Sequence, residues 1–130
     1  MLQKDESAIH KHVVSREMMQ HFGETFDDFT LLHYDDEFAK KVGFKGRVVQ
    51  GALVSCLIVK SIVRSFGDSA ILRSHNLEFR RAIYPESEII VELHVLSNIR
   101  NKLVTLRSRV YLNKTVHYEG MTKIRVFENL

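Results

Sequence analysis

The segment VVQGALVSCLIVKSIVRSFG, residues 48–67, limits the possible folds more than any other part of the chain. Its apolar residues recur at helical spacing and cover almost the whole circumference of the helix that they predict. A helix of this kind is stable only when protein surrounds it on most sides. The remaining residues must therefore supply a cover for a buried helix. The few polar positions within the helical stretch are Ser55, Lys60, Ser61, Arg64 and Ser65.

The second half of the chain predicts this cover as an antiparallel sheet. Apolar and polar residues alternate over residues 75–79, 89–95, 104–112 and 116–126, which is typical of strands with one buried face. The connections between these strands are short, and Asn113-Lys114 is a two-residue hairpin signal. Short connections make neighbouring strands antiparallel. A sheet that curls around one buried helix gives an α+β domain.

The predicted helix has more apolar surface than one sheet can cover. A chain of 130 residues has the size of one ordinary domain, so we expect residues 1–130 to form a single domain. Such a chain has little else to pack on the side of the helix that faces away from the sheet. A second copy of the chain would cover that side, through the sheet edge or the helix face. The sequence therefore predicts a homodimer.

Composition and charge exclude several classes of protein. The chain is 45% hydrophobic and 27% charged, which is typical of a globular protein and not of a disordered one. The formal charge is +3, and the basic residues are scattered along the chain. A nucleic-acid-binding protein shows a concentrated basic stripe, so we expect no nucleic-acid partner.

The cysteine and hydropathy patterns indicate a compartment. Cys56 is the only cysteine, so no disulfide can form within one chain, and a reducing environment fits. No apolar run is long enough to span a membrane, and the N-terminus lacks the apolar stretch of a signal peptide. We therefore expect a cytoplasmic protein. The histidines show no spacing that suggests shared metal ligands, so we expect no metal site.

Two short helices are predicted before the buried one. The first covers residues 16–22, with Ser15 as its N-cap and Gly23 at its end. The second covers residues 36–42, with Asp35 as its N-cap, acids in its first turn and lysines in its last turn. Capping and dipole effects thus explain many of the charges in the stretch DDFTLLHYDDEFAKK.

Asp28 and His33 are the members of that stretch without a structural explanation. Their separation of five positions brings them together in a loop, and in neither a regular helix nor a regular strand. Surface loops are rich in both residue types, so the pair could be solvated loop residues. An acid and a histidine this close could equally form a general acid/base pair. Spacing by itself leaves both interpretations open.

Three segments around this pair resemble a known family. Residues 28–35, DFTLLHYD, stand where the family carries Asp-x-Asn-Pro-x-His-x-Asp, and Gly43-Phe44 follows at matching spacing. Residues 47–53, RVVQGAL, stand where a Val-His-Gly segment opens the central helix. The chain thus resembles the MaoC-like dehydratases, the single-hotdog (R)-specific enoyl-CoA hydratases, from about residue 12 to the C-terminus. The resemblance implies a hotdog fold, in which a long antiparallel sheet wraps around a buried central helix.

The resemblance also implies a reaction and roles for particular residues. The reaction is hydration of a trans-2-enoyl thioester, or the reverse dehydration of a 3-hydroxyacyl thioester, as in fatty acid metabolism. His33 matches the histidine that orients or deprotonates water, and Asp28 matches the aspartate that shares the proton transfer. The backbone amide of Gly51 or Ala52 would stabilise charge on the thioester oxygen. The ligand is then an acyl-CoA or acyl-carrier thioester, with no further cofactor.

Other residues near the motif are expected to contact the substrate. The apolar ones would line an acyl tunnel at the subunit interface, and the arginines, with Lys45, are candidates for binding CoA phosphates. The expected substrate-binding residues are Thr30, Leu31, Phe44, Arg47, Gln50, Arg80 and Arg81.

Several positions depart from the family pattern. Thr30 replaces its asparagine, Leu31 its proline and Gln50 its histidine, while Val59 falls where the family often has a serine. The catalytic pair is retained but its supporting groups have changed, and catalysis depends on positioning. A non-catalytic acyl-CoA-binding regulator or partner protein is therefore the alternative. A hotdog thioesterase is disfavoured because residues 50–66 contain no acid.

Overall fold

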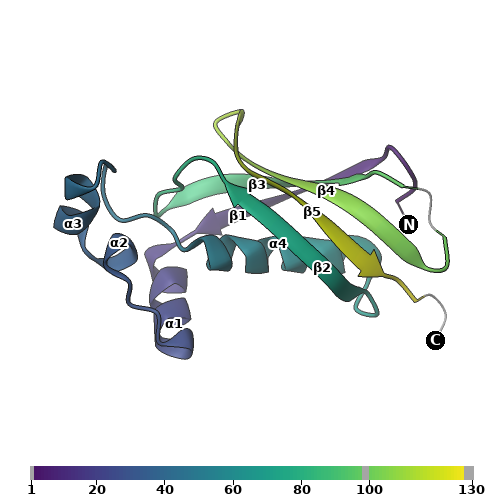
Figure 1. The fold of residues 1–130 in the computed structure, drawn as a ribbon, viewed down its shortest axis with the longest axis horizontal. Coiled ribbons are helices and arrows are strands. Elements are labelled where there is room, and N and C mark those ends of the chain that lie inside the picture. The colour runs from purple at the N-terminus through teal and green to yellow at the C-terminus, as the bar shows by residue number, and fades with distance from the viewer. Residues whose placement is uncertain (1, 98–99, 128–130) are drawn as a thin grey trace.

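One antiparallel sheet and one long helix make up most of the computed structural model, which describes residues 2–97 and 100–127. Its elements are β1 (Ser7–Val14), α1 (Arg16–Phe26), α2 (Leu31–Tyr34), α3 (Asp36–Lys41), α4 (Gly51–Phe66), β2 (Ile71–Phe79), β3 (Ser87–Val95), β4 (Leu103–Leu112) and β5 (Thr115–Arg125). The strands lie in the order β1-β3-β4-β5-β2. The sheet curls over α4, and the three short helices gather near the N-terminal end of α4 (Figure 1).

The core lies between α4 and the inner face of the sheet. The alternation predicted for β3, β4 and β5 is confirmed, because their apolar positions are on the buried face. α4 contributes large buried side chains to the same core, including Leu53, Leu57, Ile58 and Ile62. Burying an aliphatic side chain of this size stabilises the folded state by about 1.5–3 kcal/mol. The predicted α+β architecture is therefore correct.

α4 begins at Gly51, whereas the sequence predicts a helix from Val48. The N–H of Val48 donates to the carbonyl oxygen of Leu32 at 3.0 Å, and that of Val49 donates to the carbonyl oxygen of Ile83 at 2.8 Å. These bonds to other segments hold the two valines outside the helix. They also place the start of α4 between α2 and the connection from β2 to β3.

α1 continues one turn beyond its predicted end at Gly23 and stops at Phe26. Gly23 is needed for close packing, because a Cβ atom at this position would lie 2.1 Å from the hydroxyl oxygen of Tyr34. Asp27 ends the helix in the left-handed conformation, with φ at 51°. The absence of a side chain at Gly23 thus lets α1 and α2 pack closely together.

Three local predictions about helix ends and turns are confirmed. The side chains of Ser15 and Asp35 each accept a backbone N–H from the first turn of the helix that follows. Asn113 and Lys114 both have positive φ angles, 49° and 65°, as a tight two-residue hairpin turn requires. Among the described residues, no helix is long and apolar enough to cross a membrane.

The sequence pattern does not predict β1. Its inward positions include His10 and His12, whereas Ile9 and Val13 on its other face are exposed. Apolar and polar residues are thus mixed on both faces of β1, so the strand lacks the alternation that a buried apolar face shows. The two imidazole rings hydrogen-bond serine hydroxyls of α4 at 2.7 and 2.9 Å, which compensates for their burial. Long-range partners that the sequence does not display therefore decide that this segment is a strand.

The histidines of β1 predict how stability depends on pH. Burial, and then the positive charge of Arg64, hold the pKa values of His10 and His12 below their ordinary value. The unfolded chain therefore binds protons more readily, so the stability from these groups is fully present above about pH 6.5 and is lost as the pH falls. We expect the urea midpoint of unfolding to decrease between about pH 7.5 and about pH 5.5.

Two variants test this assignment. His12→Gln removes a titrating group that bonds Ser61, so the urea midpoint of this variant should change less with pH than that of the unaltered protein. His21→Gln, on the exposed face of α1, is the matched control and should keep the full pH dependence. Equal pH dependence in all three proteins would contradict the role of the β1 histidines.

Candidate active site

The imidazole of His33 is held in one tautomer by the backbone. Nδ1 of His33 lies 2.7 Å from the carbonyl oxygen of Val48. A carbonyl oxygen can only accept, so Nδ1 carries the hydrogen and Nε2 keeps its lone pair when the ring is neutral. The N–H of Val48 in turn donates to the carbonyl oxygen of Leu32, so α2 and the segment before α4 bond each other twice. This arrangement fixes the ring and leaves Nε2 as a base.

The carboxylate of Asp28 is held by the residue two positions further on. The hydroxyl of Thr30 donates to Oδ1 of Asp28 at 2.7 Å, and the N–H of Thr30 donates to the same oxygen at 3.3 Å. These hydrogen bonds, together with the nearby charge of His33, hold the pKa of Asp28 below its ordinary value. Asp28 is therefore an ionised carboxylate at neutral pH, close enough to His33 for the two charges to interact.

A pocket of about 250 Å³ lies at the N-terminal end of α4, and His33 forms part of its wall. The pocket is bounded by α2, by the segment before α4 and by the end of β2 with the connection that follows it. Asp28 does not line it. The lining includes Leu32, His33, Phe44, Gly51, Phe79, Arg80, Arg81 and Tyr118.

Gly51 brings the start of α4 to the pocket. The first N–H groups of a helix have no intrahelical acceptor, and the described residues supply none for the amides of Gly51 and Ala52. Gly51 lines the pocket, whereas Ala52 is exposed and does not. A Cβ atom on Gly51 would lie 2.5 Å from the ring of Phe79, so any larger residue here would displace that ring from the pocket wall. The Gly51 amide is therefore the helix-end donor available to a ligand there.

The other expected binding residues divide into two groups. Phe44, Arg80 and Arg81 line the pocket, as the resemblance implies for substrate-binding residues. Leu31 is exposed and Arg47 lies away from the pocket, where its Nε is 3.6 Å from Oδ1 of Asp36. These two side chains therefore lie outside the pocket that contains His33.

Gln50 is fully buried and connects three helices. Its side-chain nitrogen donates to the hydroxyl of Tyr34 at 2.8 Å and to the carbonyl oxygen of Met19 at 3.2 Å. The Tyr34 hydroxyl itself donates to Met19 at 2.5 Å. Gln50 thus joins α1 and α2 to the start of α4 and positions the segment that carries His33. The Gln50 side chain therefore does not line the pocket but holds the helices beside it in place.

No sequence signal identifies three residues that shape the pocket and its surroundings. Tyr34 stands between two motif positions without belonging to the motif, and Phe79 and Tyr118 look like ordinary strand residues. The rings of Phe79 and Tyr118 contact each other, with centroids 4.8 Å apart. Burial raises the pKa of Tyr118 to about 12, so its hydroxyl stays protonated at neutral pH. Their importance depends on contacts between distant segments.

The described residues contain no group of three or more histidine, cysteine, aspartate or glutamate side chains that could hold a metal ion. The groups available at the pocket are an imidazole whose Nε2 is open, an ionised carboxylate nearby and a helix-end amide. Such a set can move protons at a substrate and stabilise a developing oxyanion.

A sheet wrapped around a central helix is the class of structure known as a hotdog fold, and a solved structure confirms it. The R-hydratase PhaJ1 from Pseudomonas aeruginosa matches with a TM-score of 0.89 and 25% sequence identity, covering 98% of this chain and 84% of that one. The expected fold class is therefore correct.

The chain belongs to the MaoC like domain family, which it matches over residues 3–119. The mitochondrial 3-hydroxyacyl-[acyl-carrier-protein] dehydratase of Arabidopsis thaliana is 35% identical over 94 residues, covering 71% of this chain and 56% of that protein. The mitochondrial dehydratase FERN of Solanum lycopersicum is 38% identical over 79 residues, covering 59% of this chain and 47% of that protein. The chain thus spans about half the length of both relatives.

The buried contact between Gln50 and Tyr34 predicts a loss of stability in Tyr34→Phe. This variant removes a hydroxyl that both donates and accepts, so we expect the free energy of unfolding to fall by about 1–2 kcal/mol. Urea denaturation measures this change. Tyr111→Phe is the control, because its hydroxyl lies on β4, outside the hydrogen-bond network of Gln50, and its bond to Glu92 is long, at 3.4 Å. An equal loss in both variants would contradict a special role for the Tyr34 hydroxyl.

Proposed function

We propose that the protein hydrates a trans-2-enoyl thioester to a 3-hydroxyacyl thioester, or catalyses the reverse dehydration. The substrate would be an acyl-CoA or an acyl-carrier thioester, and no further cofactor is needed. One observation carries the proposal: the pocket contains both a histidine with a free Nε2 and an unpaired helix-end amide, with an ionised aspartate close to the histidine. Membership of the family and the names of the dehydratase and R-hydratase relatives support the same reaction class.

The proposed hydration uses His33 as base and then as acid, with the Gly51 amide and Asp28 in supporting roles. Nε2 of His33 takes a proton from water as the water oxygen bonds to C3 of the substrate. The electrons of the C2=C3 double bond move toward the thioester, and the Gly51 amide donates to the oxygen that gains negative charge. The imidazolium then gives its proton to C2. Asp28, which is ionised, orients the water and stabilises the positive charge on His33.

Replaced family residues favour the alternative, a protein that binds acyl-CoA without turning it over. Two of these replacements nevertheless have supporting contacts. Thr30 donates two hydrogen bonds to Asp28, and Gln50 ties α4 to α1 and α2. A site whose positioning groups remain hydrogen-bonded can retain the geometry that catalysis needs. These contacts support the enzyme over the binding protein.

A hydration assay with crotonyl-CoA tests the proposal. Loss of the conjugated double bond is followed by absorbance. His33→Ala removes the base and Asp28→Asn removes the charge, and each should lower kcat/KM by about 100-fold or more, as expected for removal of a group in acid–base catalysis. Asp27→Asn is the matched control, because Asp27 is an exposed neighbour in a left-handed conformation that asparagine adopts readily.

Two results would contradict the proposal, one for the assigned residues and one for catalysis itself. Activity that survives both His33→Ala and Asp28→Asn would show that another group performs the reaction. Absence of turnover with enoyl-CoA of several chain lengths, together with tight binding of the same compounds, would establish the binding protein instead.

We further propose that two copies associate through β2, as the sequence predicts a homodimer. β2 lies at the end of the sheet, and among the described residues only β5 pairs with it. It exposes Ile71, Leu72 and Phe79 at 50%, 45% and 57%, so both its apolar side chains and its backbone edge are available to a partner. Phe79 also lines the pocket, so a partner strand there would help to enclose the substrate.

Light scattering, which measures the mass of the protein in solution, tests the proposed dimer, and edge variants test its interface. The unaltered protein should have the mass of two chains, and Leu72→Lys should give the mass of one, because it places a charge on the free edge of β2. Ile9→Lys is the control on β1, the opposite edge, where Ile9 is 62% exposed. Dissociation by Ile9→Lys and not by Leu72→Lys would place the interface on β1 and contradict an interface on β2.

Two cellular compartments are compatible with the proposed reaction. The sequence pattern favours the cytoplasm, whereas both dehydratase relatives are named as mitochondrial proteins. Both compartments hold acyl thioesters, so the proposed reaction is compatible with either.

A further inference from the structure

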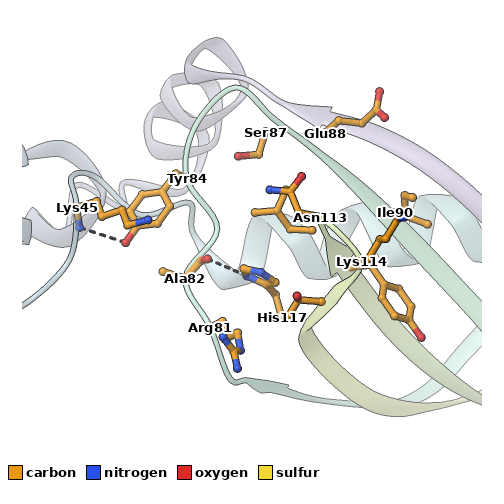
Figure 2. Close-up of a pocket in the computed structure, with 13 residues that line it drawn as sticks. Lys45, Arg81, Ala82, Tyr84, Ser87, Glu88, Ile90, Asn113, Lys114 and His117 are labelled. Atoms are coloured by element: carbon orange, nitrogen blue, oxygen red, sulfur yellow. Dashed lines mark hydrogen bonds between the residues drawn. The ribbon is translucent and has the colours of Figure 1, made fainter.

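A second and larger pocket, of about 720 Å³, shares Arg81 and Ala82 with the candidate active-site pocket. Ile90 of β3 lines it and stands between Ile89 and Val91, which point into the core. Since side chains alternate along a strand, the second pocket opens on the face of the sheet opposite α4. The segment from Arg81 to Tyr84 forms one wall of the second pocket (Figure 2), and its residues Arg81 and Ala82 also line the pocket of His33.

Hydrogen bonds hold this wall in place. Nδ1 of His117 donates to the carbonyl oxygen of Ala82 at 3.0 Å, and the N–H of Lys45 donates to the hydroxyl of Tyr84 at 3.1 Å. The Lys45 side chain takes no part in its bond, and Nε2 of His117 has no partner among the described residues. Both groups therefore remain available to a ligand.

The cations that line this pocket differ from the neighbouring arginines in having no carboxylate partners among the described residues. Lys45, Arg81 and Lys114 line it, and among the described residues none of the three has a carboxylate within ion-pair distance. Arg80, by contrast, pairs with Glu78 at 3.6 Å and Glu119 at 3.7 Å.

Arg47 is similarly occupied by Asp36. Two of the four cations expected from the sequence to bind phosphate, Arg47 and Arg80, are thus partly neutralised by neighbouring carboxylates. The other two, Lys45 and Arg81, line the second pocket with Lys114, and Glu88 is the one carboxylate in that lining.

The hairpin turn between β4 and β5 places one of these cations. Asn113 and Lys114 adopt positive φ angles, which makes the turn tight and keeps it beside the wall segment. Lys45 comes from the loop after α3, and Arg81 from the connection after β2. Three separate segments thus bring positive charge to one concave site (Figure 2).

We propose that this second pocket binds the phosphate at the far end of the substrate's pantetheine arm. The inference rests on the proposed function, because a pantetheine arm carries the thioester at one end and a phosphate at the other. The thioester would occupy the pocket of His33, and the arm would cross the wall at Arg81. Acyl-CoA and carrier-protein thioesters share this phosphate, and lysine and arginine side chains bind phosphate oxygens through charge-assisted hydrogen bonds.

A series of crotonyl thioesters tests the phosphate site. We would compare kcat/KM for crotonyl-CoA, crotonyl-4′-phosphopantetheine, a crotonyl-carrier protein and crotonyl-pantetheine, which lacks the phosphate. Lys114→Gln and Lys45→Gln should each lower kcat/KM for the three phosphate-bearing substrates, relative to crotonyl-pantetheine, by about two- to fivefold, as expected for a partly exposed ion pair. The effect should shrink at high salt.

Lys123→Gln is the matched control. Lys123 is an exposed lysine of β5 that does not line the second pocket, so its loss changes the net charge equally and should leave the substrate ratio unchanged. Unchanged ratios in Lys114→Gln and Lys45→Gln would overturn the phosphate site, and so would a loss confined to crotonyl-CoA, which would indicate recognition of its nucleotide.

A binding measurement distinguishes an error in the phosphate site from an error in the proposed reaction. If no crotonyl thioester is hydrated, the proposed reaction is wrong, and calorimetry with butyryl-CoA and butyryl-pantetheine tests the pocket independently. Tighter binding of butyryl-CoA that is lost in Lys114→Gln would support the phosphate site. Equal affinity for both compounds would contradict it.

Discussion

Burial of α4 is the constraint on which the rest of the structure depends. Because this helix is apolar on nearly every side, the sheet must curl around it, and the short helices must pack near its N-terminal end. That end carries N–H groups with no intrahelical acceptor, and the fold places Gly51 among them beside a pocket. The same packing that stabilises the core therefore puts a positive dipole end next to the histidine that the motif selects.

The segment before α4 couples the fold to the candidate chemistry. Val48 accepts a hydrogen bond from the ring of His33 and donates one to Leu32, so it both orients the base and anchors the helix that carries it. Gln50 extends this support to α1 through Met19 and Tyr34. Two of the positions that depart from the family pattern, Thr30 and Gln50, thus make hydrogen bonds that support the geometry of the site.

Electrostatics divides the basic residues of this region into two populations. Arg47 and Arg80 face carboxylates and contribute to holding the surface of the sheet and helices together. Lys45, Arg81 and Lys114 line one concave site, and none of them has a carboxylate within ion-pair distance among the described residues. Proximity to the motif selects Lys45, Arg47, Arg80 and Arg81 alike, because pairing with carboxylates depends on which segments lie side by side.

The sequence by itself determined the buried helix, the second half of β2, the strands β3 to β5, the two capped short helices and the resemblance of the motif to a family. Each of these follows from local periodicity, capping or spacing, which a chain displays without being folded. Only the tertiary structure decided that β1 is a strand, that α4 starts at Gly51 and that Gly23 serves a helix contact. It also decided the tautomer of His33 and the grouping of unpaired cations. These features depend on hydrogen bonds, contacts and charges between residues far apart in the sequence, and no local pattern encodes them.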